Sequence, residues 1–452
     1  MNWKTRVRAW IEKLRASLWL IPSLMTAAAV ASSFLAVAAD RHVAEKFEHV
    51  LGPLFAGGPE GARSILSTLA GSMITVTGVT FSITVVALSL ASQQFGPRVL
   101  RNFMVDRGNQ AVLGTFIATF IYSLLVLRTV RGYNDHDFVP YLAVTIGVGL
   151  ALVSLGVLIF FIHHVSASIQ ADRVVAAIAA EMIDSIERLF PEGIGHAPED
   201  ASEIESHLPD GEPGRVKCRN SGYIQVLDED SVLHLAERCE CLIQLIHSPG
   251  DFVFEGVTLA RVWPADRMNE GFEEHVNRAI VLGRSRTPAQ DVEFAFAQLV
   301  ELAVRSLSPA INDPFTASSC INRIGAGIAR LATLEFPSPY RYGADGKPRV
   351  IATAPSFAEI SSVAFDQIRH EGGHKPSIAI SLLQAIASIL PFATEPERRD
   401  VLFHHARMIR QHAVHSIPEA EDRSVVDRVF NQVLDAYHHR EVETRMKQEI
   451  LR

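Results

Sequence analysis

Cysteine is scarce in this chain. Its 452 residues include four, Cys218, Cys239, Cys241 and Cys320. No two of them form a CxxC pair, and none has the spacing of a zinc site. Cys239 and Cys241 are two residues apart, so on a strand both side chains would point to one face. We therefore interpret the four as ordinary buried thiols of a reduced compartment, and expect neither a metal nor another cofactor.

The common catalytic signatures are also missing. The chain has no GxSxG, HExxH, P-loop or GxGxxG in a convincing context, so we expect no enzymatic activity. A formal net charge of -8 leaves no broad basic surface for nucleic acid. Four histidines crowd one late helix but lack the paired spacing and carboxylate of a metal site, so we interpret them as surface residues. They are His404, His405, His412 and His415.

Charged residues and histidines are absent from four intervals in the first part of the chain, residues 16–39, 64–97, 108–127 and 138–162. A helix that crosses the hydrocarbon core of a bilayer needs about 20 apolar residues. These intervals predict a four-helix transmembrane domain over residues 17–163, in contact with the lipid bilayer. The predicted spans are 17–39, 65–92, 111–128 and 138–162.

Basic residues favour one orientation of these spans. Residues 1–16 form a basic segment with Trp3 and Trp10, which predicts an amphipathic helix at the membrane interface. With this end inside, the two inner segments hold eight Lys or Arg, against five in the two outer loops. The even number of spans then predicts that both termini are cytoplasmic.

The second span carries many hydroxyl groups for a segment bound for lipid. A long stripe of small or polar residues advances by three or four positions and so lies on one side of a helix. It comprises Ser64, Thr68, Gly71, Thr75, Gly78, Ser82, Val86, Ser89 and Gln93. A shorter set, Thr77, Thr80 and Thr84, lies on the opposite side. The long stripe fits two interpretations: close packing against other helices, or the lining of a water-filled path in a homo-oligomer. Its polar and glycine members are our candidate pore-lining residues.

The fourth span has no helix breaker before Pro191, which predicts a helical extension over residues 164–190. Its heptad spacing fits either parallel packing of several copies or docking on the chain's own soluble domain. In the first case Asp172 would form a ring of carboxylates at the cytoplasmic mouth of a pore. Residues 191–215 are rich in proline, glycine and acidic residues and predict a linker.

The remainder of the chain predicts a cytoplasmic α+β domain. Residues 216–263 contain short strand patterns, and "SPGDFVFEGVTLARV" resembles the hairpin of hammerhead barrels related to biotinyl and lipoyl domains. The resemblance implies a small β-barrel, but the exposed turn lacks the lysine of an acyl carrier. Residues 264–452 predict a mainly helical region, interrupted by a hairpin at "YGADGKPRV".

Two helix starts and a polar turn stand out within the helical region. Thr287, before Pro288, and Asp313, before Pro314, are predicted N-caps. Around these positions lie Arg284, Arg286, Arg305, Asn312 and Asp313. They fit either a pocket for an anion or nucleotide, or a buried network of salt bridges that fixes a loop.

Two long segments resemble a bacterial family of predicted membrane proteins known only as domain of unknown function 2254. They are "GARSILSTLAGSMITVTGVTFSITVVALSLASQQFGPRVLRNFMVDRGNQAVLGTFIATFIYSLLVLRTVR" and "GRSRTPAQDVEFAFAQLVELAVRSLSPAINDPFTA". The resemblance covers nearly the whole chain and implies an inner-membrane location, but no activity. We hypothesise an oligomeric channel for a small inorganic ion, with a cytoplasmic assembly or gating domain. The alternative is a membrane-anchored protein that binds a small cytoplasmic ligand and has no conducting path.

Overall fold

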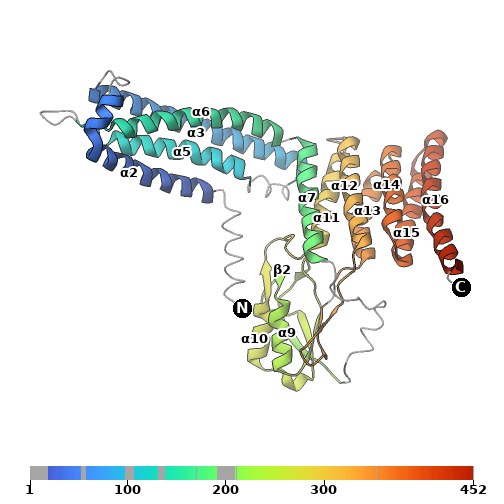
Figure 1. The fold of residues 1–452 in the computed structure, drawn as a ribbon. Coiled ribbons are helices and arrows are strands. Elements are labelled where there is room, and N and C mark those ends of the chain that lie inside the picture. Colours follow the sequence, from blue (N-terminus) through green and yellow to red (C-terminus); the bar gives the residue numbers. More distant parts are fainter. Residues whose placement is uncertain are drawn as a thin grey trace. The chain divides into compact units, whose positions relative to one another are not determined.

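The computed structural model describes residues 19–51, 58–96, 106–130, 138–168, 170–190, 209, 211–352 and 354–450 of the chain (Figure 1). They belong to two compact units, an N-terminal unit that extends to Arg173 and a C-terminal unit that begins at Val174. The predicted interfacial segment at residues 1–16 and most of the predicted linker lie outside the described residues.

The described part of the N-terminal unit contains four helices long and apolar enough to cross a membrane, as the charge-free intervals predict. They are α2 (Leu20–Leu51), α3 (Gly58–Phe95), α5 (Arg107–Leu127) and α6 (Tyr141–Ser168). Helix α5 is the most enclosed, because α2, α3 and α6 all pack against it (Figure 1). At 38 residues α3 is about 57 Å long, well beyond the roughly 30 Å of a hydrocarbon core.

Polar side chains of two other helices fix the start of α6. Asp40 of α2 is 2% exposed, and its carboxylate accepts hydrogen bonds from the N–H groups of Leu142 and Ala143, both at 2.9 Å. Those N–H groups belong to the first turn of α6, where they have no partner within the helix. Tyr122 of α5 donates its hydroxyl to the carbonyl of Ala143. The start of α6 is therefore tied to both α2 and α5.

The helical extension of the fourth span consists of two helices and not one. Helix α6 ends at Ser168, and α7 runs from Ala171 to Leu189. Between them the N–H of Gln170 bonds to the carbonyl of Ala167, three residues back, so the regular α-helical pattern is not maintained. Helix α7 buries an apolar face within the C-terminal unit, which agrees with docking on the chain's own domain. That face contains Val174, Val175, Ile178, Ala179, Met182 and Ile186.

The strands of the C-terminal unit form two open sheets. One has the order β1 (Gly214–Lys217), β5 (Thr258–Trp263), β3 (Leu242–Leu245), β8 (Pro348–Ala352) and β7 (Tyr340–Tyr342). The other has the order β4 (Phe252–Val253), β2 (Gly222–Leu227) and β6 (Ile280–Gly283). Helices α9 (Glu229–Arg238) and α10 (Glu270–Ala279) complete this part. The described strands close no barrel, so the predicted hammerhead barrel is not confirmed.

The predicted hairpin at "YGADGKPRV" forms as β7 and β8, but its place in the fold was not foreseen. Strand β8 pairs in parallel with β3, so that Ile243 lies beside Val350 and Leu245 beside Ala352. These four side chains are buried, all of them in the core shared with β2, β5, α9 and α10. The sheet that begins at residue 214 is therefore completed by a segment from the middle of the helical region.

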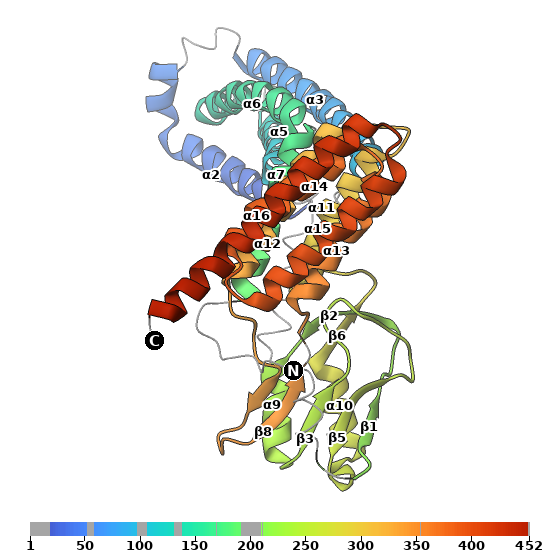
Figure 2. The same ribbon diagram turned by 90° about the vertical axis from the view of Figure 1, so that its right-hand side faces the viewer.

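The remaining helices lie side by side, with the strands at one end of them (Figures 1 and 2). They are α11 (Val292–Leu307), α12 (Pro314–Thr333), α13 (Phe357–Gly372), α14 (Pro376–Ile389), α15 (Pro396–Ser416) and α16 (Ala420–Ile450). Asp313 caps α12 as predicted. The predicted cap of α11 is wrong, because Asp291, and not Thr287, accepts the N–H of Phe294. Gln290 instead bonds to both backbone groups of Leu227, which joins the helical region to β2.

Candidate functional site

The two hydroxyl-bearing faces of α3 have different surroundings. Every predicted pore-lining residue is exposed on the surface of the single chain. These are Ser64, Thr68, Gly71, Thr75, Gly78, Ser82, Ser89 and Gln93. On the opposite face Thr80 is 1% exposed, and Thr77 and Thr84 are half-buried. Helix α3 therefore turns its short polar patch toward its own bundle and its long stripe away from it.

Hydroxyl groups on both faces are satisfied by the backbone of α3 itself. Thr75 donates to the carbonyl of Gly71, and Ser82 to that of Gly78, each at 2.9 Å. Such bonds to the carbonyl four residues earlier are the common way for a helix to carry serine and threonine in an apolar setting. The oxygen lone pairs remain available on the exposed stripe.

The glycines of the stripe pack against no other part of the chain that the structure describes. A Cβ built at Gly71 or Gly78 meets no atom within 4 Å. Gly114 of α5 is the opposite case, since a Cβ there would lie 2.6 Å from the sulfur of Met25 and 3.2 Å from the Cα of Pro22. Glycine thus permits close helix contact at Gly114, whereas at Gly71 and Gly78 it leaves a shallow, unoccupied surface.

A hydrogen-bonded contact that the sequence did not reveal joins the start of α5 to α6 at one end of the bundle. The Nε2 atom of His164 lies 2.6 Å from a carboxylate oxygen of Asp106, which also caps α5 through the N–H of Gly108. A Cβ at Gly108 would lie 2.7 Å from the same His164 nitrogen, so a larger residue there would displace the imidazole. Phe160 stacks on the imidazole ring one turn earlier. His164 therefore has a packing role as well as a position near the end of the span.

The arginine region resolves into a salt bridge at the start of α11. Arg286 donates from Nε and Nη2 to the two oxygens of Asp291, at 2.7 and 2.8 Å, and its guanidinium lies over the ring of Phe294. Burial lowers the pKa of Arg286, but its hydrogen bond to Asp291 and the charges of Asp291 and Glu293 outweigh that effect, so the net shift is upward. Because Asp291 is 4% exposed, this pair matches the salt-bridge interpretation better than an open anion pocket.

The Asn-Asp-Pro turn lies at the other end of α11. Lys375 donates to the side chain of Asn312 at 2.9 Å and to the carbonyl of Leu307 at 3.2 Å. Thr316 and the first N–H groups of α12 bond to Asp313, and these bonds lower the pKa of Asp313. Sixteen residues of α11, about 24 Å, separate this turn from the Arg286 salt bridge. The structure therefore does not bring the five predicted residues into one pocket.

Arg284, the remaining member of the predicted arginine pocket outside α11, is exposed. It borders a hollow of about 720 Å³ between β2, β6 and α10, together with Arg219, Asn277 and Arg278. Arg278 there pairs with Glu274. The hollow is thus a polar surface with both signs of charge.

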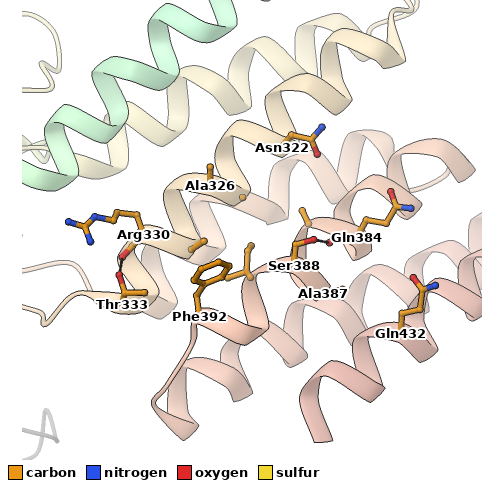
Figure 3. Close-up of a pocket in the computed structure, with 13 residues that line it drawn as sticks. Asn322, Ala326, Arg330, Thr333, Gln384, Ala387, Ser388, Phe392 and Gln432 are labelled. Atoms are coloured by element: carbon orange, nitrogen blue, oxygen red, sulfur yellow. Dashed lines mark hydrogen bonds between the residues drawn. The ribbon is translucent and has the colours of Figure 1, made fainter. Parts of the chain in front are cut away.

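A larger groove, which the sequence did not reveal, lies between α12, α14 and α16 (Figure 3). Its volume is about 950 Å³, in the range of small-molecule sites. The floor consists of small side chains, Gly325, Ala326, Ala329, Ala385 and Ala387. Polar side chains border it, namely Asn322, Arg330, Thr333, Gln384, Ser388 and Gln432, and Phe392 lies at one end. The feature of the sequence that could have indicated this groove is the recurrence of Gly and Ala at three- and four-residue spacing on α12.

The late histidines are not all on the surface. His405 is 3% exposed, 3.6 Å from Asp366 and against the ring of Phe365, so the surface interpretation is wrong for this residue. Burial lowers the pKa of His405. No group of three or more His, Cys, Asp or Glu in the described residues could hold a metal ion.

The thiols of the C-terminal unit are mostly enclosed. Cys218, Cys241 and Cys320 are buried, and Cys239 is half-buried. Burial raises the pKa of Cys241 to about 11 and that of Cys320 to about 12. These two thiols are therefore protonated and poorly reactive near neutral pH.

Four long apolar helices followed by a mixed α+β unit define a multi-span membrane protein. The chain belongs to the family described as predicted membrane protein (DUF2254), whose model matches residues 15–388. It is 30% identical over 429 residues to the uncharacterized proteins Mb1321c of Mycobacterium bovis and Rv1290c of Mycobacterium tuberculosis. Each alignment covers 93% of this chain and 81% of the relative. No solved structure matches the chain.

Proposed function

We propose that the protein is a homo-oligomeric channel for a small inorganic ion, with its path lined by the exposed stripe of α3. The observation that carries this proposal is the sorting of polar residues on α3. The whole stripe is exposed on the single chain, whereas Thr80 on the opposite face is buried. A helix that only contacts lipid gains nothing from such a stripe, because hydrocarbon offers no partner to hydroxyl groups.

Helix α3 also has a large surface available for a neighbouring copy. Only 6% of the residues in its most apolar stretch are buried, against 44% in α5. Small residues such as Gly71 and Gly78 allow close approach between helices, and the outward lone pairs of Thr75 and Ser82 could coordinate a hydrated cation. In such an assembly Asp172, which is exposed in the first turn of α7, would add a carboxylate from each copy near the mouth.

Ion flux into liposomes that contain the purified protein tests the proposal. We expect flux that Ser82→Phe abolishes and that Ile74→Phe preserves, because Ile74 is an exposed residue outside the stripe. Ser82→Asp should shift the selectivity toward cations. Absence of flux for common ions under varied voltage, membrane tension and pH, with intact oligomers, would overturn the proposal.

The groove between α12, α14 and α16 favours a second candidate function, a membrane-anchored protein that binds a small ligand. The side chains of Asn322, Gln384 and Gln432 could hydrogen-bond a polar ligand above the small-residue floor. A small-molecule screen by thermal stabilisation tests this candidate. A hit should lose its effect in Ala385→Phe, which fills the floor, and keep it in Arg284→Ala, outside the groove.

We further propose an inner-membrane location with both termini in the cytoplasm. The excess of Lys and Arg in the segments assigned to the inner side supports this orientation. Reporter fusions at the C-terminus and in the loop at residues 131–137 test it. Activity of a periplasm-specific reporter at the C-terminus would contradict it.

A further inference from the structure

The turn between α11 and α12 carries an exposed apolar tip, which we define as Pro309, Ala310, Ile311 and Phe315. We propose that this tip inserts into the headgroup region of the bilayer that the fourth span crosses. The proposal is independent of whether the protein conducts ions.

Phe315 has the most exposed side chain among the large hydrophobic residues that the structure describes. Its exposed fraction is 85%, that of Ile311 is 40%, and Pro309 and Ala310 are exposed beside them. Single exposed apolar residues are ordinary on a protein surface, but here four lie within seven positions, at the turn and in the first turn of α12.

The tip is held in a defined conformation. The N–H of Asn312 bonds to the carbonyl of Ser308, and the N–H of Asp313 to that of Ser306, both at 2.8 Å. Asn312 is in the left-handed region with φ 49°, and Lys375 holds its side chain. Asp313 then caps α12. Phe315 is therefore presented outward by a hydrogen-bonded turn, and its exposure is a property of the fold.

The tip lies at the end of the C-terminal unit where the chain enters from the fourth span. Helices α7 and α11 run antiparallel, because Arg188 donates to the carbonyl of Pro288 while Met182 and Phe296 meet at Gly327. From Met182 back to Ala171 and from Phe296 forward to Leu307, eleven residues of helix each span about 16 Å. The start of α7 and the end of α11 are thus at the same level along the two helices.

The covalent chain limits how far this end can be from the bilayer. Helix α6, the most hydrophobic of the four candidate spans, ends at Ser168, and α7 begins at Ala171. Three steps between consecutive Cα atoms reach at most about 11 Å. The interfacial region of a bilayer extends several ångströms beyond its hydrocarbon core. The start of α7 is therefore within about 11 Å of the last described residue of α6.

The chemistry of the tip suits that location. Aromatic side chains are favoured at the membrane interface, and apolar area transferred from water there is stabilising. Lys375, whose ammonium group lies against the turn, supplies a cation at the same end. A second copy of the chain could also cover an apolar patch; we choose lipid because the chain passes from the fourth span into the C-terminal unit within a few residues.

Site-specific labelling of the full-length protein in nanodiscs of phosphatidylcholine and phosphatidylglycerol tests the proposal. In a Cys239→Ser background the remaining native thiols are buried, so an environment-sensitive fluorophore can be placed through Phe315→Cys or Ile311→Cys. Phe392→Cys is the matched control, because Phe392 is 51% exposed and lies by Thr333, at the opposite end of α12. Having two tip positions guards against a variant that folds poorly.

We expect the probes at positions 311 and 315 to emit at shorter wavelength than the probe at 392. Lipids with a nitroxide near the headgroup should quench them at least twofold, and aqueous iodide should quench them less than the control. Two results would overturn the proposal: iodide quenching at 315 equal to that at 392, or shielding from iodide without quenching by the labelled lipid, which would indicate a protein contact.

Discussion

The two units differ in how far some of their polar side chains are buried: two arginines of the C-terminal unit have partners inside it, whereas the polar stripe of α3 in the N-terminal unit is exposed. In the C-terminal unit Arg398 is 7% exposed and donates to three carbonyls at the end of α12, and Arg286 pairs with buried Asp291. In the N-terminal unit α3 leaves a stripe of polar and small residues exposed along much of its length. Arg286 and Arg398 thus find their partners within the C-terminal unit, whereas the stripe of α3 is a surface suited to something outside the single chain.

The largest effect is expected from truncating a side chain that satisfies buried groups of the C-terminal unit. Arg398→Ala removes the donor to the carbonyls of Leu331, Ala332 and Leu334, and should cost about 3–5 kcal/mol. Arg410→Ala breaks an exposed pair with Asp427 and should cost at most about 1 kcal/mol. Thermal unfolding of both variants measures the difference. Equal shifts in Tm would show that the buried contacts of Arg398 stabilise the unit no more than the exposed pair of Arg410.

Two glycines test whether α3 is complete within one copy. Gly114→Leu inserts a side chain against Met25 and Pro22 and should destabilise the bundle by about 1–3 kcal/mol or more. Gly71→Leu meets open space and should leave the single chain folded while weakening association between copies. Folded yield and native mass spectrometry measure the two effects. An unchanged oligomer in Gly71→Leu would place the contact between copies elsewhere.

A pH effect is expected in the C-terminal unit. Burial lowers the pKa of His405 in the folded state, so below its unfolded pKa of about 6.5 the unfolded chain binds more protons and stability falls as the pH falls. The facing groups are Asp366, which raises this pKa, and His404 and Arg369, which lower it. His405→Phe should flatten the decline in Tm between pH 7 and 5. His415→Phe, at an exposed position, should retain it.

The smallest effect is expected from removing one hydroxyl of the stripe. Thr75 bonds only to the carbonyl of Gly71 on its own helix, and Thr75→Val keeps its shape. The stability of the single chain should change by less than about 0.5 kcal/mol. Thermal unfolding in detergent measures this change. A larger loss would show that the hydroxyl has a partner beyond its own helix.

Features that depend on local sequence were predictable here. The four apolar helices follow from intervals without charge, and the cap at Asp313 follows from an acidic residue before proline. The two faces of α3 follow from helical spacing, although sequence could not tell which face was buried. That outcome depends on packing with α5 and α6, which is a property of the tertiary fold.

Features that depend on distant residues were missed. Asp291 outcompetes Thr287 as a cap because Gln290 is held by the backbone of Leu227, 63 positions earlier in the chain. The predicted arginine pocket grouped residues that are close together in the sequence. In the structure α11 lies between them, so Arg286 and the Asn-Asp-Pro turn are at opposite ends of this helix. The groove forms where α12, α14 and α16 come together, and residue spacing on one helix does not reveal which other helices lie beside it.

The parallel pairing of β8 with β3 makes the strand-rich and helical parts of the C-terminal unit inseparable. A chain that stops after α12 would lack Val350 and Ile351, and the edge of β3 would be open to strands from other molecules. The helical part alone would in turn carry a hairpin with no sheet to join. Synthesis must therefore proceed beyond residue 352 before the first sheet can be completed, although helices α9, α10, α11 and α12 are already made by then. We therefore expect the strand-rich and helical parts to fold together and to occur together in related proteins.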